Sequence, residues 1–416
     1  MRVAYLTHQY FPRHVGGTEV YTHGLAVRAQ AAGAAVEVFT YHESPSGDRR
    51  DYGVVSTAHD GIPVREIHYN VSVADDPARA EYDNPETGRM VREELRRFRP
   101  DLVHVMHAMK LSGSALSACR DLGIPFVVTL CDFWFICPRH TLLTSAGRLC
   151  DGPAHRLACA RCLRDTHGIL RAPRRLWRDA RAVGGRQRFL LNALAGARRI
   201  IALCEFTRRA FAANGVPAAR IEVIEHGLEV ARLDAAAWRP GVVPRIGFIG
   251  SLVPHKGAHL LLEALARIPH VRVECRIHGA VPANAYGQRL WTLAGADPRV
   301  RLMGPFPPDA LGRVLAETDL LAVPSLWYEN DPLVVKAAFY CGTPVLAARI
   351  GSLGEMVEPE RNGWLAPPGD AGAWAAALER FAAARAPSPV APTPVKTMDE
   401  NAREMLAIYT EELARR

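Results

Sequence analysis

The chain has 416 residues, which is too long for one ordinary hydrophobic core and predicts two domains. Its composition is 49% apolar and 23% charged, a balance that excludes a disordered chain and favours well-buried globular domains. No apolar run reaches the length of a membrane-spanning helix, and the amino terminus enters a strand without a signal-peptide pattern. We therefore expect a cytoplasmic protein.

The net charge of +8 comes largely from arginine and is concentrated in residues 171–199, where Asp179 is the only acidic residue. The charge has two alternative interpretations. The region either makes peripheral contact with an anionic membrane or a lipid diphosphate, or it is a solvated helix face. A nucleic-acid partner is not expected, because the region lacks any recognisable helix-turn-helix, zinc-finger or RNA-binding motif.

Short apolar runs alternate with helical patterns along nearly the whole chain, which is typical of parallel sheets with helices on both faces. The first series of predicted strands is 3–6, 36–40, 102–106, 126–130, 200–203 and 222–224. The second series is 246–249, 271–277, 300–303, 320–323, 345–347 and 364–366. The pattern predicts an α/β protein with two doubly wound, Rossmann-like domains.

Proline and glycine mark the expected domain boundaries. The segment 238–244 has the composition of a linker, so we place the first domain at 1–240 and the second at 241–395. A second proline-rich stretch precedes a last helical pattern within residues 396–416.

Two glycine loops join a strand to a helix. Gly16 and Gly17 follow the first strand and allow backbone N–H groups to approach an anion, although glycines here can also serve only the turn. In the second domain, Ser251 and Lys256 lie in the corresponding loop. Lys256 is placed to act as a point charge on a diphosphate, the alternative being a solvated lysine at a helix start.

Residues 324–345 read as strand end, polar loop, helix, glycine stop and strand. Pro332 suits the first position of a helix, and Gly342 ends that helix. At the carboxyl edge of such a strand, a helix amino end can hold a phosphate while a carboxylate reaches sugar hydroxyls. The candidate binding residues at this edge are Glu329, Asn330, Asp331, Pro332 and Leu333.

Together these motifs resemble the family 4 glycosyltransferases of the GT-B fold, over nearly the full chain from Gly16-Gly17 to the segment 362–365. The resemblance implies two Rossmann-like domains facing a central cleft, with the terminal helix packing back on the first domain. It also implies retaining transfer of a hexose from a nucleotide-diphosphate sugar to a hydroxyl of a glycan or glycolipid. No catalytic metal is expected, and the implied role is cell-surface polysaccharide or lipopolysaccharide assembly.

The same resemblance implies roles for individual residues. Glu329 would hydrogen-bond sugar hydroxyls, while Lys256 and the N–H groups around Asp331 to Leu333 would stabilise the departing diphosphate. Gly16 and Gly17 would face the donor.

The chain departs from the family pattern at Ser251, where an Arg is frequent, at Cys131, where a His precedes Asp132, and at Ala337, where a second Glu is usual. A lost carboxylate contact costs on the order of 1.5–3 kcal/mol. One explanation is a catalytically impaired, donor-binding or scaffold homologue. Another is a changed donor, such as a thymidine-diphosphate 6-deoxyhexose. A GT-B nucleotide-sugar epimerase is a third alternative, which Glu329 and Lys256 disfavour.

His107 lies just beyond the strand that ends at Met106, where it is either a substrate contact or a structural histidine. We name His107 and Asp132, with Glu329, as candidate catalytic residues.

Four of the nine cysteines fall in a loop-rich insertion at about residues 132–190. They are Cys137, Cys150, Cys159 and Cys162. Four thiolates suit a structural zinc ion with tetrahedral geometry and, less well, an iron–sulfur cluster. Unligated, reduced thiols remain the alternative.

Overall fold

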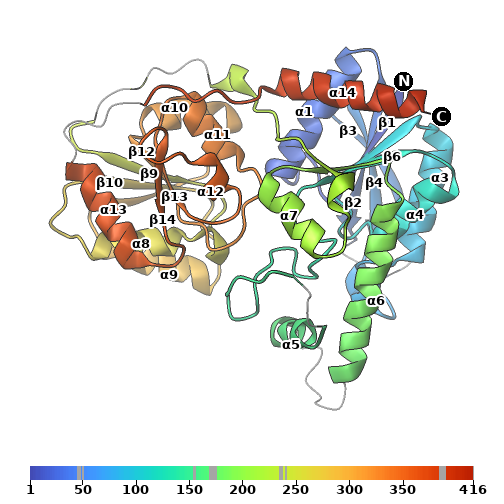
Figure 1. Cartoon of the computed structure of the whole chain (residues 1–416), viewed down its shortest axis with the longest axis horizontal. Helices are drawn as coiled ribbons and strands as arrows, with labels where there is room; N and C mark the ends of the chain where they lie inside the picture. The colour runs from blue at the N-terminus through green and yellow to red at the C-terminus, as the bar shows by residue number, and fades with distance from the viewer. Residues whose placement is uncertain are drawn as a thin grey trace. The chain divides into compact units, whose positions relative to one another are not determined.

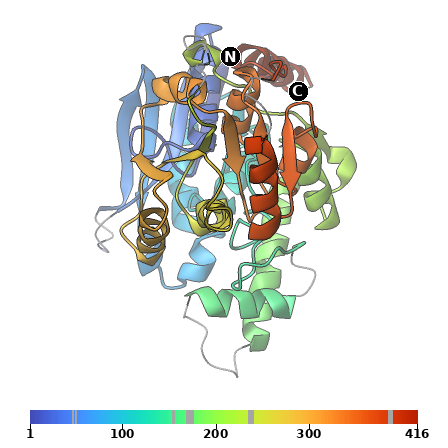
Figure 2. The same cartoon turned by 90° about the vertical axis from the view of Figure 1, so that its left-hand side faces the viewer.

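The computed structural model describes residues 1–44, 48, 51–152, 156–167, 176–233, 238, 241–383 and 390–415. They form two compact units, one comprising Met1–Gly227 with Met398–Arg416 and the other Leu228–Thr397. Each unit is built on a largely or wholly parallel sheet flanked by helices (Figures 1 and 2). The expected fold class of two doubly wound domains is confirmed.

The first unit contains an eight-stranded sheet in the order β3-β4-β2-β1-β5-β6-β7-β8. Neighbouring strands are parallel except for the antiparallel pair β3 and β4. The strands are β1 (Arg2–Thr7), β2 (Ala35–Glu43), β3 (Gly53–His59), β4 (Ile62–Tyr69), β5 (Leu102–Val105), β6 (Phe126–Leu130), β7 (Arg199–Ala202) and β8 (Ile221–Val223). The chain reverses its direction of winding between β1 and β5, which is where ligands bind in open α/β sheets.

The helices of the first unit are α1 (Gly17–Ala31), α2 (Pro77–Ala80), α3 (Pro85–Phe98), α4 (Gly113–Asp121), α5 (Arg156–His167), α6 (Leu176–Ala195), α7 (Glu205–Ala213) and α14 (Met398–Ala414). Helix α3 shows how the sequence sets their limits. The Asn84 side chain accepts hydrogen bonds from the N–H groups of Glu86 and Thr87, and Pro85 occupies the first turn. Arg99 ends the helix in the left-handed conformation.

The terminal helix α14 belongs to the first unit, although the second unit precedes it in the chain. It packs beside α1 (Figure 1). The buried Tyr409 hydroxyl lies 2.6 Å from Nδ1 of His104, whose Nε2 lies 2.7 Å from the Thr129 hydroxyl. Burial lowers the pKa of His104 to about 3, so its ring is neutral and supplies one donor and one acceptor to the two hydroxyls. This network fixes α14 to β5 and β6.

The second unit contains a wholly parallel six-stranded sheet in the order β11-β10-β9-β12-β13-β14. Its strands are β9 (Arg245–Ile249), β10 (Glu274–His278), β11 (Val300–Gly304), β12 (Leu320–Val323), β13 (Val345–Ala348) and β14 (Gly363–Ala366). Its helices are α8 (Ala258–Ala266), α9 (Ala285–Gly295), α10 (Leu311–Ala316), α11 (Leu333–Tyr340), α12 (Leu353–Met356) and α13 (Ala371–Ala383). This strand order places the switch point between β9 and β12.

The division between the units falls at Gly227 and Leu228, whereas the sequence placed it at residue 240. The Trp238 indole donates a hydrogen bond of 2.9 Å to Asp319, and Asp319 also forms a buried ion pair of 2.9 Å with Arg245. These contacts make Trp238 part of the second unit rather than of a free linker.

The antiparallel hairpin of β3 and β4 was not among the predicted strands. It turns at Asp60 and Gly61, whose φ angles of 47° and 77° match a two-residue type I′ turn. An Asp-Gly pair between alternating residues is the signal that could have found it.

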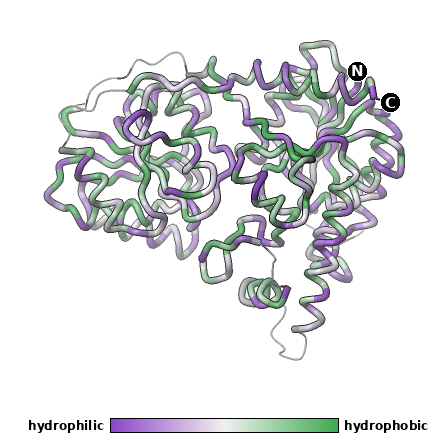
Figure 3. The backbone as a smooth tube through the Cα atoms, in the orientation of Figure 1, coloured by the Kyte–Doolittle hydropathy of each residue, from purple (hydrophilic) through white to green (hydrophobic). Residues whose placement is uncertain are grey.

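Apolar residues follow the inner strands of each unit, as the hydropathy colouring in Figure 3 shows. Strands β5, β6, β12 and β13 are buried along their whole length, as expected for parallel strands covered on both faces. None of the helices in the described part of the chain is both long and apolar enough to cross a bilayer.

Candidate active site

Lys256 and Glu329 form an ion pair at the switch point of the second sheet. The Lys256 ammonium lies 2.7 Å from Oε1 and 2.9 Å from Oε2 of Glu329. Glu329 is only 5% exposed and also accepts hydrogen bonds from the Ser325 hydroxyl at 2.7 Å and the Trp327 indole at 2.8 Å. Lys256 additionally lies 5.0 Å from the centre of the Trp327 ring. The sequence identified both charged residues but not their pairing.

The surroundings of Glu329 keep its carboxylate ionised. Burial alone raises the pKa of a carboxyl group, but the Lys256 charge and the three hydrogen-bond donors lower the pKa of Glu329 below its ordinary value. The site therefore presents a fixed carboxylate and an ammonium in contact. Such a pair can bind a polar ligand through its remaining hydrogen-bonding capacity.

Local backbone geometry explains how the two loops meet. Gly257 has a φ of 75°, and a Cβ atom there would lie 1.9 Å from the carbonyl oxygen of Pro324, so only glycine fits. The N–H of Leu326 donates to the His255 carbonyl at 2.8 Å. The loop after β9 is thus joined to the loop after β12, which brings Lys256 to Glu329.

The remaining predicted residues of this loop are buried around the start of α11. Asn330 and Asp331 are each 8% exposed, and Asp331 forms a buried ion pair of 2.8 Å with Lys336. Pro332 is the N-cap residue rather than the first helical residue, and Leu333 begins the helix. The burial of Lys336 was not predicted, because a lysine within a helical pattern is usually exposed.

Two positions that depart from the family pattern differ in exposure. Ser251 is exposed in the loop after β9. Ala337 is 0% exposed and packs in the apolar core of the second unit. The Ala337 side chain is therefore enclosed by core residues, and its position gives no structural support to the changed-donor explanation.

In the first unit, the buried carboxyl group of Glu19 lies against the glycine loop after β1. Glu19 is 4% exposed and accepts hydrogen bonds from the N–H groups of Gly16 and of Glu19 itself. A Cβ atom on Gly16 would lie 2.5 Å from Oε2 of Glu19, whereas one on Gly17 would meet nothing within 4 Å. The Glu19 carboxyl group thus packs against Gly16 and accepts from N–H groups of the glycine loop. Burial raises the pKa of Glu19, the hydrogen bonds offsetting this only in part.

His107 and Asp132 are paired at the carboxyl ends of β5 and β6. Nε2 of His107 lies 2.8 Å from Oδ2 of Asp132, and Nδ1 accepts a hydrogen bond of 3.1 Å from the Met109 N–H. Burial would raise the pKa of Asp132, but His107 and the Trp134 N–H lower it to about 2. The carboxylate is therefore ionised and held in place.

A second histidine, which the sequence analysis did not identify, completes this group. The His8 ring lies 4.1 Å from the His107 ring, centre to centre. Burial and the neighbouring His107 lower the pKa of His8 well below its ordinary value, so His8 is neutral. Cys131 contacts Thr18 of the glycine loop, and burial raises the pKa of its thiol. A histidine directly after β1 was the available signal for His8.

The four cysteines of the insertion form no disulfide, and Cys159 and Cys162 lie in α5. Burial, followed by the charges of Cys137, Cys150 and Cys162, raises the pKa of Cys159 to about 12. The Cys162 sulfur accepts a hydrogen bond from the Ser145 N–H at 3.2 Å. Among the described residues, no three of these sulfur atoms lie within 4.8 Å of one another.

The arginine-rich region is less uniform than the sequence suggests. Arg171, Arg174 and Arg175 and the side chain of Arg178 lie outside the described residues. Arg186 is buried and donates to the Trp134 carbonyl at 2.6 Å. Arg199 forms ion pairs with Glu222, Glu411 and Glu412. Exposed arginines remain at 181, 188 and 198.

Comparison with known proteins identifies both units. The model of "Glycosyltransferase Family 4" matches residues 15–232, and that of "Glycosyl transferases group 1" matches residues 243–384. The D-inositol 3-phosphate glycosyltransferase of Rhodococcus opacus (strain B4) is 29% identical over 389 residues, covering 88% of this chain and 77% of the relative. The enzyme of the same name from Mycobacterium sp. (strain KMS) is 32% identical over 216 residues, covering 48% of this chain and 47% of the relative.

Solved structures show the same fold. Anabaena HepE in complex with UDP matches with a TM-score of 0.65 and 18% identity, covering 100% of this chain and 99% of that one. Sucrose-phosphate synthase from Thermosynechococcus elongatus matches with a TM-score of 0.65 and 20% identity, covering 99% and 96%. The chain has the GT-B fold and belongs to glycosyltransferase family 4.

Proposed function

We propose that this glycosyltransferase moves a hexose from a nucleotide-diphosphate sugar to a hydroxyl of a glycan or glycolipid, with retention of configuration at the anomeric carbon. The observation that carries the proposal is the buried Glu329 carboxylate in contact with Lys256 at the switch point of the second sheet. The UDP and UDP-glucose complexes of the structurally similar HepE support a nucleotide-sugar donor and make uridine the first base to test.

The proposed reaction requires stabilisation of the charge that develops on the leaving diphosphate and correct placement of the sugar. When the bond between the anomeric carbon and the diphosphate oxygen breaks, negative charge grows on the diphosphate. Lys256 offers a cation, and the N–H groups that open α11 at Leu333 add a partial positive charge. Glu329 is proposed to accept hydrogen bonds from sugar hydroxyls while it orients Lys256.

In the first unit, His107 and Asp132 are proposed to contact substrate hydroxyls. Asp132 is ionised, and its Oδ2 lies 2.8 Å from Nε2 of His107, which carries the ring proton because Nδ1 accepts from the Met109 N–H. Gly16 and Gly17 are proposed to shape the loop through Glu19 rather than by binding a phosphate directly.

A transfer assay tests this function. The full chain is incubated with uridine-, guanosine-, adenosine- and thymidine-diphosphate hexoses and with lipid-linked or free glycan acceptors. Proton NMR of the product reads both the sugar transferred and the anomeric configuration. A product of inverted configuration would contradict the retaining mechanism, and release of nucleotide without any transferred sugar would contradict the acceptor class.

One observation favours a second candidate, a donor-binding homologue with little turnover. Glu329 already accepts hydrogen bonds from Lys256, Ser325 and Trp327, which leaves it limited capacity for sugar hydroxyls. Such a homologue would bind nucleotide diphosphates tightly and release no product in the transfer assay.

We further propose that the protein is cytoplasmic and makes peripheral contact with an anionic membrane through helix α6. Trp177 is 73% exposed, and its spacing to Arg181 and Arg188 places all three on one side of the helix. An aromatic ring flanked by arginines suits the surface of an anionic bilayer, where a glycolipid acceptor would reside. Sedimentation with phosphatidylglycerol vesicles should be weakened by Trp177→Ser, with exposed Trp291→Ser as the matched control.

For the cysteine group we propose one structural zinc ion held by Cys137, Cys150, Cys159 and Cys162. The support is that Cys137, Cys150 and Cys162 lie near enough for their charges to raise the pKa of Cys159; the sulfur atoms would move closer together on binding the ion. Binding a cation deprotonates such thiols and removes that repulsion. The ion would fix the insertion without taking part in transfer.

A further inference from the structure

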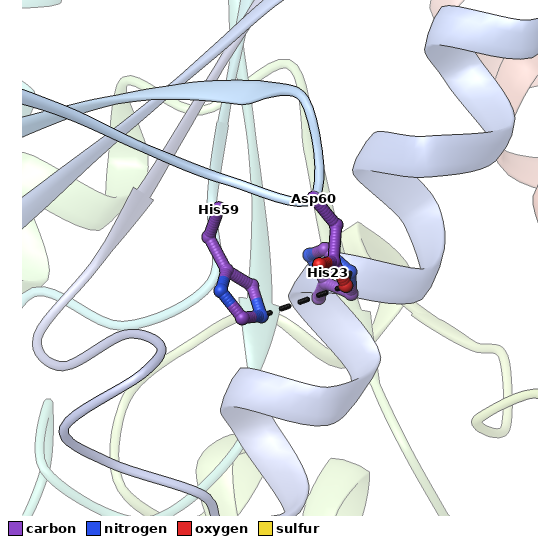
Figure 4. Close-up of side chains that lie close together, drawn as sticks. All are labelled: His23, His59 and Asp60. Atoms are coloured by element: carbon purple, nitrogen blue, oxygen red, sulfur yellow. Dashed lines mark ion pairs between the residues drawn. The ribbon is translucent and has the colours of Figure 1, made fainter.

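A second set of metal-ligating atoms lies in the first unit, apart from the cysteines. Figure 4 shows His23 from α1 facing His59 and Asp60 from the β3–β4 hairpin. One ligand atom of each residue lies within 4.8 Å of the other two. None of the three has a role in the proposed transfer reaction.

The separations of these atoms fit ligands of one ion better than hydrogen bonds. Nε2 of His23 lies 3.3 Å from Oδ2 of Asp60, and Nε2 of His59 lies 3.6 Å from the same oxygen. Charge-assisted hydrogen bonds between such groups are shorter, at about 2.7–2.9 Å. Ligands about 2.0–2.2 Å from a tetrahedral zinc ion are separated by roughly 3.4 Å from one another.

Neighbouring groups already orient the ligands. The Tyr10 hydroxyl lies 2.8 Å from Nδ1 of His23, and in the tautomer in which Nδ1 donates to this hydroxyl, Nε2 carries the lone pair that a metal ion requires. The Phe11 ring stacks on His59 with a centre separation of 4.8 Å and an interplanar angle of 3°. A hydrogen bond to the second ring nitrogen is the usual way in which a metal-binding histidine is oriented, and the Phe11 ring restricts the rotation of His59.

We propose that His23, His59 and Asp60 bind one divalent transition-metal ion, zinc above all, with water in the fourth position. Two imidazoles and one carboxylate suit zinc and disfavour magnesium, which prefers oxygen ligands. The side chains of His23 and His59 are 14% and 23% exposed and that of Asp60 is 65% exposed, so an ion has access from solvent. The ion would link α1 to the hairpin and thereby fix the helix that begins at the Gly16-Gly17 loop.

Cobalt(II) titration of the full chain, followed by absorption spectroscopy, tests the proposal. Cobalt bound by nitrogen and oxygen shows visible d–d bands without the near-ultraviolet sulfur charge-transfer band that the cysteine group would give. Working in a Cys159→Ser, Cys162→Ser background isolates the histidine site further. We expect one such cobalt ion per chain and a zinc-dependent rise of the melting temperature.

The variants are chosen to keep the fold. Asp60→Asn removes the charge while Asn also tolerates the positive φ of this turn, and His59→Gln removes the imidazole. Each should raise the cobalt dissociation constant by roughly tenfold or more and abolish the zinc-dependent melting shift. His270→Gln, at an exposed ion pair with Glu379 in the second unit, should change neither. Cobalt affinity that is equal in wild type, Asp60→Asn and His59→Gln, or cobalt bound only with sulfur charge-transfer bands, overturns the proposal.

Discussion

The ammonium of Lys256 contacts both carboxylate oxygens of Glu329, at 2.7 and 2.9 Å, and so joins the loop after β9 to the loop after β12. The pair lies where the six-stranded sheet reverses its order, the usual ligand position in such sheets. Removing either partner leaves the other charge with less compensation, which makes the choice of substitution important. For Glu329, a substitution that keeps the shape of the side chain is therefore the informative one.

Glu329→Gln should lower turnover by about a hundredfold or more, because it removes the negative charge beside Lys256 while keeping the shape of the side chain. Steady-state kinetics with the preferred donor measure it, and circular dichroism checks the fold. Glu360→Gln, an exposed site in the same unit, is the control and should leave turnover unchanged. Near-normal turnover of Glu329→Gln would remove Glu329 from the reaction.

Asp132 should stabilise the first unit in a pH-dependent way. Its pKa of about 2 in the folded state lies below the ordinary value of 3.8, so its contribution is fully present above about pH 5 and is lost as pH falls from about 4 towards 2. The shift corresponds to stabilisation on the order of 2 kcal/mol. Urea unfolding of wild type and Asp132→Asn at several pH values measures it. The difference between the two should shrink below pH 4, and a difference that grows on acidification would contradict the assignment.

The two sheets could be predicted from the sequence because buried parallel strands are short, continuous apolar runs, such as Leu320 to Val323. The loops at Lys256 and Glu329 could also be placed, since a strand that enters a helix puts its polar residues at the carboxyl edge. The direct pairing of Lys256 with Glu329 could not be predicted, because it depends on the close approach of Gly257 to the Pro324 carbonyl.

Neither the hairpin at Asp60 nor the burial of Lys336 was predicted, because neither gives an apolar pattern in the sequence. An exposed edge strand such as β3 lacks the apolar run that marks a buried strand. A buried lysine is stabilised by one partner, here Asp331, that a helical pattern does not reveal. The motif shows that Ala337 replaces a usual Glu, but it does not show the burial of this residue, which depends on the core packing around it.

Tyr409→Phe should destabilise the first unit by about 1–3 kcal/mol, because it leaves Nδ1 of the buried His104 without its 2.6 Å partner. Urea unfolding detects the change. Thr410→Ala, an exposed neighbour on α14, should change stability by less than about 0.5 kcal/mol. Equal stability of wild type and Tyr409→Phe would show that the network does not hold α14 in place.

The cysteine group should contain about one zinc ion per chain when the protein is purified under reducing conditions without chelators. Cys159→Ser should remove that zinc and destabilise the insertion more than either sheet, as read by hydrogen exchange. Cys341→Ser, a half-buried thiol in the second unit, should retain the zinc. Elemental analysis of tag-free protein that finds the same zinc content in wild type and Cys159→Ser would leave four unligated thiols.

Calorimetric titration of nucleotide diphosphates tests the central claim, a nucleotide-sugar site built around Lys256, most directly. Wild type should bind at least one of uridine, guanosine, adenosine and thymidine diphosphate, and Lys256→Ala should raise that dissociation constant by roughly tenfold or more. Arg289→Ala, which removes an exposed cation from the same unit, should bind as wild type does. If no nucleotide diphosphate binds, or if Lys256→Ala binds it as tightly as wild type, the proposed donor site is contradicted.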